Sequence, residues 1–126
     1  MIEDKRSFKR GEIYMANLNP YKGSEQGGIR PVIILQNNIG NLYSPTLVVA
    51  PLTSRFKKKY IPTHFIIENV GALKDDSLVL LEQIKTIDKC RIKNYVGTIS
   101  KEEMKKLEEG IKVSLGLTIP VEQDAP

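Results

Sequence analysis

Short apolar runs bounded by turn-forming residues are the feature that most constrains the fold of this chain. Gly, Pro, Asn and Ser separate these apolar runs through much of the first hundred residues. Apolar runs between such signals are typical of buried strands. We therefore expect buried strands at Val32–Gln36, Leu47–Leu52 and Ser77–Leu81.

Other segments are expected to extend the same sheet. Glu12–Asn17 alternates polar and apolar residues, which predicts a strand with one face toward the core. Weaker strand patterns occupy Thr63–Ile67, Gln83–Ile87 after a kink, and Tyr95–Ile99. Asn37–Pro45 contains a glycine and a Ser-Pro step, which predicts a turn.

Only the C-terminal part of the chain predicts a helix. Ser100 and Glu103 form the capping-box pattern with which helices begin. Apolar residues then repeat at helical spacing until the chain reaches Gly116, at Met104, Leu107, Ile111 and Leu115. Because strands and helices do not alternate, parallel βαβ folds are disfavoured. The sequence predicts a mainly β (α+β) fold, a small antiparallel barrel with flanking helices and a C-terminal amphipathic helix.

The composition suits a single domain with a polyanionic partner. The 126 residues are enough for one hydrophobic core. Residues 1–60 hold ten Lys and Arg against four Asp and Glu, whereas residues 61–126 hold nine against eleven, so net charges of +6 and −2 give the overall +4. A basic half favours a nucleic-acid partner, although +4 is also an ordinary charge for a soluble protein. The 6% of aromatic residues disfavours a surface that stacks bases on several rings.

Cysteine content and hydropathy predict the compartment. Cys90 is the only cysteine, which excludes an internal disulfide and a Cys-based zinc site, and we expect it to be a partly buried apolar residue. No apolar run reaches the roughly 20 residues that cross a bilayer. Met1–Arg10 lacks the apolar segment of a signal peptide. We therefore expect a cytoplasmic protein with no membrane partner.

A long loop rich in turn-forming residues leads to one arginine. Residues 19–28 precede Arg30 and the first buried strand, and loops of this length in small domains are often functional. Gly27 and Gly28 would let a bulky partner approach the backbone. The guanidinium of Arg30 carries a fork of donors that suits a phosphodiester. An ordinary surface arginine is the alternative.

The available side chains exclude several catalytic mechanisms. The adjacent acidic pair Asp75-Asp76 is interpreted as part of a turn, and the pairs Glu102-Glu103 and Glu108-Glu109 lie on the predicted helix, so a metal site is not expected. His64 is the only histidine, which excludes a ribonuclease mechanism with two histidines. Cleavage of RNA by the RNA's own 2′-hydroxyl group needs neither a metal ion nor a pair of histidines, because the protein must mainly align the substrate and stabilise charge. Arg30 and Thr53 are the candidates, provided that their strands pair and reach a common end of the sheet.

Several motifs follow one another in an order that a known family shares. They are Lys9–Tyr14, Gly23–Pro31, Gln36–Asn37, Ser44–Thr46, Pro51–Thr53 and Leu80–Lys89. These motifs resemble the MazF/PemK toxins, and most closely the MazF toxins of Gram-positive bacteria. The resemblance predicts a single toxin domain over residues 9–117, with short tails at residues 1–8 and 118–126.

The resemblance implies a fold, an activity and partners. It implies an SH3-like barrel, a homodimer and a metal-independent endoribonuclease of a type II toxin–antitoxin system, with no cofactor. Such a toxin cuts single-stranded RNA (mRNA) at short specific sequences, with a U/A-rich site containing ACA suggested here, and leaves 2′,3′-cyclic phosphate and 5′-hydroxyl ends. A MazE-like antitoxin would occupy the RNA groove. A CcdB-like toxin that inhibits DNA gyrase and an SH3-like binding module are the alternatives.

The resemblance also assigns roles to residues. Arg30 and Thr53 match the catalytic arginine and threonine of the family. Arg30 would hold the scissile phosphate and stabilise its extra charge, and Thr53 would donate a hydrogen bond to a phosphate oxygen. Glu25 would accept the proton of the 2′-hydroxyl, order the loop or read a base edge.

Further polar residues are expected to contact the RNA. Gln26 and Gln83 carry amide groups suited to unpaired bases, although Gln83 could equally satisfy backbone groups at the sheet edge. Lys57–Lys59 would attract the RNA backbone. The remaining expected RNA contacts are Gly27, Gly28, Ser54 and Arg55.

Overall fold

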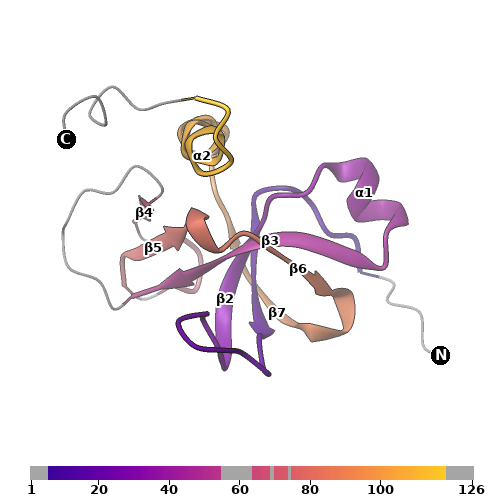
Figure 1. The fold of residues 1–126 in the computed structure, drawn as a ribbon. Coiled ribbons are helices and arrows are strands. Elements are labelled where there is room, and N and C mark those ends of the chain that lie inside the picture. The colour runs from indigo at the N-terminus through magenta and orange to yellow at the C-terminus, as the bar shows by residue number, and fades with distance from the viewer. Residues whose placement is uncertain (1–5, 55–63, 69, 74, 119–126) are drawn as a thin grey trace.

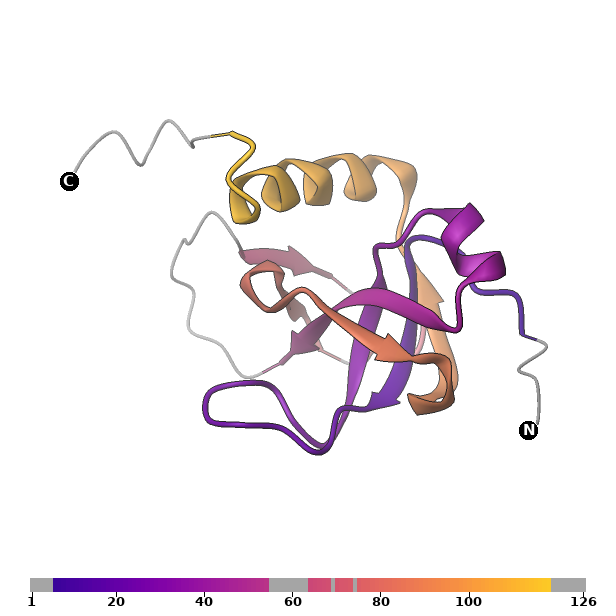
Figure 2. The same cartoon turned by 45° about the vertical axis from the view of Figure 1, so that its right-hand side comes forward.

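The computed structural model describes residues 6–54, 64–68, 70–73 and 75–118, which form a bent antiparallel sheet flanked by two α-helices (Figure 1; Figure 2). The elements in chain order are β1 (Glu12–Asn17), β2 (Ile29–Ile34), α1 (Asn38–Tyr43), β3 (Thr46–Thr53), β4 (His64–Ile67), β5 (Ser77–Leu80), the 3₁₀ turn η1 (Leu81–Gln83), β6 (Lys85–Asp88), the 3₁₀ turn η2 (Lys89–Arg91), β7 (Ile92–Thr98) and α2 (Lys101–Ser114).

Strand β3 is the centre of the sheet. The strand order is β4-β5-β3-β2-β1-β7, and β6 also pairs with β3. β6 pairs with the first half of β3, from Thr46 to Val49, whereas β5 pairs with its last two residues, Leu52 and Thr53. Because β3 changes partner along its length, the sheet bends into a half-barrel. The predicted mainly β fold with antiparallel strands and flanking helices is therefore confirmed.

The central strands are buried on both faces, which explains their uninterrupted apolar sequences. Ile33 of β2 and Ala50 of β3 belong to one core cluster, and their neighbours Val32 and Val49 belong to a second. Helix α2 covers the first cluster with Leu107, which is fully buried. Figure 2 shows α2 lying across one side of the sheet.

The capping box at the start of α2 is confirmed, but the buried stripe of this helix is shorter than predicted. Ser100 Oγ accepts a hydrogen bond from the backbone N–H of Glu103 (3.1 Å), and the Glu103 carboxylate accepts one from the Ser100 N–H. The helix ends at Ser114, so Leu115 lies beyond its last turn and is 59% exposed. Gly116 follows with a positive φ of 75°, which favours glycine.

The predicted turn over Asn37–Pro45 is wrong, because part of it forms helix α1. The Asn37 side chain caps this helix by accepting a hydrogen bond from Gly40 N–H (2.8 Å). The buried Asn41 side chain donates to the carbonyl of Gln36 (2.9 Å). A helix of six residues is too short to show a helical period. Distant residues also hold it, because the Arg10 N–H donates to the Asn38 side chain (2.8 Å) and Lys89 Nζ donates to the Asn41 carbonyl (2.7 Å).

Several strand boundaries also differ from the expected ones. β1 has its predicted bounds, whereas β2 begins at Ile29 and β7 at Ile92, each three residues earlier than expected. The kink predicted before Gln83–Ile87 is the turn η1, after which β6 pairs with β3. Strands begin before their apolar runs because backbone pairing extends beyond the buried side chains.

Cys90 is exposed, so its predicted partial burial is wrong. The residue lies in η2, where the Asp88 carboxylate accepts a hydrogen bond from the Cys90 N–H (2.9 Å). The hydrogen bond with Asp88 raises the pKa of the Cys90 thiol. Within the described residues, no helix has the length and apolar character to span a bilayer.

Candidate functional site

Strand pairing brings Arg30 and Thr53 to one cavity. β2 and β3 are antiparallel with Val32 opposite Pro51. Arg30 lies two residues before Val32 and Thr53 two residues after Pro51, so both residues reach the same end of the sheet. A cavity of about 190 Å³ opens there. Its lining residues are Ile29, Arg30, Pro31, Leu52, Thr53, Ser54, Leu73, Asp75 and Ser77. The condition set in the sequence analysis, that the two strands pair and reach a common end of the sheet, is therefore met.

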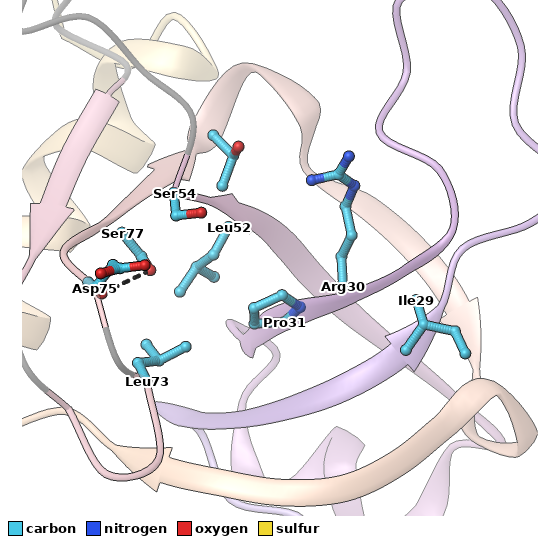
Figure 3. Close-up of a pocket in the computed structure, with 9 residues that line it drawn as sticks. Ile29, Arg30, Pro31, Leu52, Ser54, Leu73, Asp75 and Ser77 are labelled. Atoms are coloured by element: carbon cyan, nitrogen blue, oxygen red, sulfur yellow. Dashed lines mark hydrogen bonds between the residues drawn. The ribbon is translucent and has the colours of Figure 1, made fainter.

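The lining residues come from two sides of the cavity. Figure 3 shows Arg30 and Ile29 on one side, and Leu73, Asp75 and Ser77 on the other. The apolar side chains of Pro31 and Leu52 lie between them (Figure 3). The cavity thus combines one guanidinium, one carboxylate, hydroxyl groups and apolar walls.

Arg30 is held by its own loop and presents its outer nitrogens. Its Nε donates a hydrogen bond to the carbonyl of Gly27 (2.8 Å), and its backbone lies opposite Ala16 of β1. In the part of the chain that the structure describes, its terminal nitrogens have no hydrogen-bond partner. The side chain is therefore oriented and still has donors for an anion.

Thr53 is the last residue of β3, and the residue is almost completely buried, with 8% exposed. Leu78 of β5 lies opposite its backbone. Ser54, which follows it, is exposed at the cavity. The sheet thus fixes the position of Thr53, whereas Ser54 lies just beyond the strand.

Glu25 orders the β1–β2 loop in this structure. Its Oε1 accepts a hydrogen bond from the Lys22 N–H (2.7 Å), and its own N–H donates to the carbonyl of Lys22 (3.1 Å). Glu25 does not line the cavity. Of the three roles considered for this carboxylate, the structure shows the ordering of the loop.

Gln83 connects the same loop to η1. Its Oε1 accepts a hydrogen bond from the Gln26 N–H (2.9 Å), and its Nε2 donates to the carbonyl of Ser24 (3.5 Å). These contacts match the alternative in which Gln83 satisfies backbone groups. Neither Gln26 nor Gln83 lines the cavity.

The two glycines before Arg30 serve the loop itself. A Cβ on Gly27 would lie 1.8 Å from Cδ1 of Tyr21, so the ring of Tyr21 occupies the space that we expected a bulky partner to approach. Gly28 has a positive φ of 77°, and its N–H donates to the Asn19 side chain (2.9 Å). Gly27 is therefore required for packing within the loop, and Gly28 for backbone conformation.

Arg91 anchors the base of the loop, a contact that the sequence analysis missed. Its Nη1 donates to the carbonyls of Asn17 (3.1 Å) and Asn19. The Leu18 N–H donates to Gly28 (2.9 Å), which closes the loop beside this contact. Arg91 is more than 70 residues away in sequence, so no local pattern indicates the contact.

Some expected site residues are outside the described part of the chain. Arg55 and Lys57–Lys59 lie in the segment 55–63, and the His64 side chain is likewise not described. Among the residues that are described, no group of three or more His, Cys, Asp or Glu side chains is arranged to hold a metal ion.

The chain is similar to known proteins in sequence. Residues 9–115 match the family described as "PemK-like, MazF-like toxin of type II toxin-antitoxin system". The chain is 52% identical over 111 residues to an endoribonuclease MazF of Staphylococcus saprophyticus, with 87% of this chain and 92% of the relative covered.

Solved structures share the fold. MazF from Deinococcus radiodurans superposes with a TM-score of 0.76 at 23% identity, over 89% of this chain and 99% of that one. An endoribonuclease in complex with its cognate antitoxin from a mycobacterial species gives a TM-score of 0.72 at 26% identity, over 89% and 98%. The half-barrel is therefore an architecture that solved MazF structures also have.

Proposed function

This chain belongs to the family of PemK-like, MazF-like toxins of type II toxin–antitoxin systems, and we propose that it cleaves single-stranded RNA (mRNA) at specific sequences without a metal ion. Its identity to a MazF endoribonuclease makes it an RNA-cleaving enzyme. The observation that carries the proposed chemistry is that Arg30 and Thr53 line one cavity.

The proposed reaction uses the RNA's own 2′-hydroxyl group as nucleophile. The 2′-oxygen forms a bond to the adjacent phosphorus, and the bond from phosphorus to the 5′-oxygen breaks. The products are a 2′,3′-cyclic phosphate and a 5′-hydroxyl, with the 2′-hydroxyl proton lost and one proton gained by the leaving oxygen. The protein then needs to align the phosphate and stabilise its extra negative charge.

Arg30 and Thr53 supply that stabilisation. The terminal nitrogens of Arg30 would donate hydrogen bonds to the non-bridging oxygens, and the Thr53 hydroxyl would donate another. Arginine stays protonated in proteins, so Arg30 acts as a charge stabiliser and not as the base. Glu25 stays a structural residue of the loop in this proposal, because its carboxylate already accepts a hydrogen bond from Lys22.

Family membership also supports a MazE-like antitoxin, a homodimer and a cytoplasmic location. One solved relative is an endoribonuclease in complex with its cognate antitoxin. Exposed apolar side chains at Ile39, Leu42 and Tyr43 share one face of α1. An apolar face of this kind is typical of a surface that a protein partner covers.

The test is cleavage of a long single-stranded RNA in the presence of EDTA. We expect discrete fragments with 2′,3′-cyclic phosphate ends, and complete resistance of an RNA with one 2′-deoxynucleotide at the cut site. Cleavage of that deoxy substrate would contradict the mechanism. Intact RNA together with inhibition of gyrase supercoiling would favour the CcdB-like alternative.

A further inference from the structure

The side of the cavity opposite Arg30 carries a carboxylate that the proposed reaction does not use. Asp75 is exposed and lies just before β5, in a position that the sequence analysis interpreted as a turn (Figure 3). Its backbone carbonyl accepts a hydrogen bond from the buried Ser77 hydroxyl (3.4 Å). Within the described part of the chain, nothing donates a hydrogen bond to the Asp75 carboxylate.

A carboxylate in this place disfavours a phosphate group of the RNA and favours a hydrogen-bond donor of a base. It repels a phosphate group, so the scissile phosphate belongs on the Arg30 side of the cavity. An ionised carboxylate only accepts hydrogen bonds. The donors that RNA offers on its bases are the exocyclic amino groups of adenine, cytosine and guanine, and the ring N–H groups of guanine and uracil.

The walls and the size of the cavity suit one base. Pro31, Leu52 and Leu73 provide apolar surface for the face of a ring. The volume of about 190 Å³ is below the range of about 300–1,000 Å³ that is typical of pockets for drug-sized ligands. A single base fits this description, with the rest of the RNA outside the cavity.

We propose that Asp75 is a specificity-determining residue that accepts a hydrogen bond from the exocyclic amino group of the base next to the scissile phosphate. The inference rests on the proposed endoribonuclease function. It predicts that this position is occupied by an amino-bearing base and that removal of the amino group alone slows cleavage.

The experiment compares RNA substrates that differ by one amino group. Each base that flanks the cut site is replaced in turn by its analogue without the amino group: adenosine by purine riboside, cytidine by 2-pyrimidinone riboside, or guanosine by inosine. The ratio of kcat/KM with and without the amino group is measured at each position. For the wild-type enzyme, we expect loss of the amino group at one of these positions to lower kcat/KM about 10-fold, which is the scale of one hydrogen-bonded base contact. Asp75→Ala should reduce that ratio to near one, because the variant enzyme offers no acceptor to either substrate.

Asp76→Ala is the matched control. Asp76 is the exposed neighbour of Asp75 and does not line the cavity, so its removal changes the net charge equally and should leave the ratio unchanged. An unchanged ratio in Asp75→Ala would overturn the proposal. An equal loss of kcat/KM on both substrates, with the ratio kept, would also overturn it, because it indicates a role in chemistry or folding.

The same data separate this proposal from the function on which it rests. If the wild type cleaves no RNA, the endoribonuclease mechanism fails and the role of Asp75 fails with it. If the wild type cleaves and only the Asp75→Ala ratio is unchanged, the mechanism stands and the role of Asp75 alone is refuted.

Discussion

The orientation of single side chains determines what this cavity can bind. One hydrogen bond to the Gly27 carbonyl orients the Arg30 side chain, and its terminal nitrogens have no hydrogen-bond partner among the described residues. Thr53 reaches the same cavity from a neighbouring strand, and the residue is almost fully buried. A guanidinium that is fixed before the substrate arrives stabilises developing charge without further reorganisation.

Substitution of Arg30 tests its proposed role in charge stabilisation. Arg30→Ala should reduce the cleavage rate by about 10²–10³-fold or more, the range for loss of one preorganised donor. Arg30→Lys keeps the charge and loses the fork of donors, so it should recover only part of the rate. Single-turnover cleavage of a mapped RNA measures both, and an unchanged thermal midpoint shows that the fold is intact. A wild-type rate in Arg30→Ala would refute the role.

The buried phenol of Tyr14 should make the folded protein less stable at high pH. Its side chain is buried beside Phe8 and donates a hydrogen bond to Glu12 (3.2 Å). Burial, followed by the nearby charge of Glu12, raises the pKa of Tyr14 to about 12, above the ordinary value of about 10 in the unfolded chain. The folded state therefore favours the neutral phenol, and this stabilisation is complete below about pH 10 and lost as the pH rises toward 12.

Thermal unfolding over this pH range measures the effect. The midpoint of the wild type should fall more steeply above about pH 10 than that of Tyr14→Phe, which has no phenol to ionise at this position. The comparison cancels the titration of other groups. Parallel curves for the two proteins would show that Tyr14 does not couple folding to pH.

At the scale of elements, local sequence signals determine where α2 begins. Packing against the sheet determines which of its apolar residues are buried. The capping box supplies partners for backbone groups at the first turn. Leu107 then packs into the core cluster of the sheet, with Met104 and Ile111 partly buried beside it. Leu115 has the same spacing in sequence but lies past the last turn and is exposed.

Two leucines of this region should differ strongly in their contribution to stability. Leu107→Ala removes a fully buried side chain and should lower the free energy of unfolding by about 2–5 kcal/mol. Leu115→Ala alters an exposed side chain and should change it by less than about 0.5 kcal/mol. Urea denaturation followed by circular dichroism compares them, and equal losses would contradict this description of the buried helix face.

At the scale of the whole molecule, one sheet holds the cavity and positions the loop beside it. β2 and β3 provide Arg30 and Thr53, and the segment before β5 provides Asp75. Gln83 and Arg91, both from turns in the second half of the chain, hold the β1–β2 loop at two places. The excess of basic residues in the first half of the sequence favours a polyanionic partner.

Salt should therefore weaken the binding of RNA. For an RNA made uncleavable by one 2′-deoxynucleotide, the logarithm of the association constant should fall linearly with the logarithm of the salt concentration, by about 0.7 per phosphate contact. Arg30→Ala should reduce the slope by about one such contact, whereas Lys101→Ala, at an exposed position on α2, should not. Fluorescence anisotropy measures the slopes, and the same slope for Arg30→Ala and the wild type would exclude a phosphate contact.

The sequence by itself determined the features that depend on neighbouring residues. Apolar runs between turn formers predicted the central strands, because a strand buried on both faces cannot include polar side chains at low cost. The capping box and the helical period predicted α2. The elimination of metal and histidine chemistry left Arg30 and Thr53 as candidates, and the resemblance to the family gave them their roles. For Gln83, the sequence left two roles, contact with an unpaired base or with backbone groups. Asp75 was interpreted only as part of a turn.

Only the tertiary structure decided which distant groups meet. The register of β2 on β3 set the common end that Arg30 and Thr53 share, and the path of the chain into β5 placed Asp75 across the cavity. The contacts of Gln83 with Gln26, and of Arg91 with Asn17, join segments 57 and 74 residues apart. Such contacts depend on the packing of the complete sheet and leave no local pattern in the sequence, which is why the composition of the cavity could not be predicted from neighbouring residues.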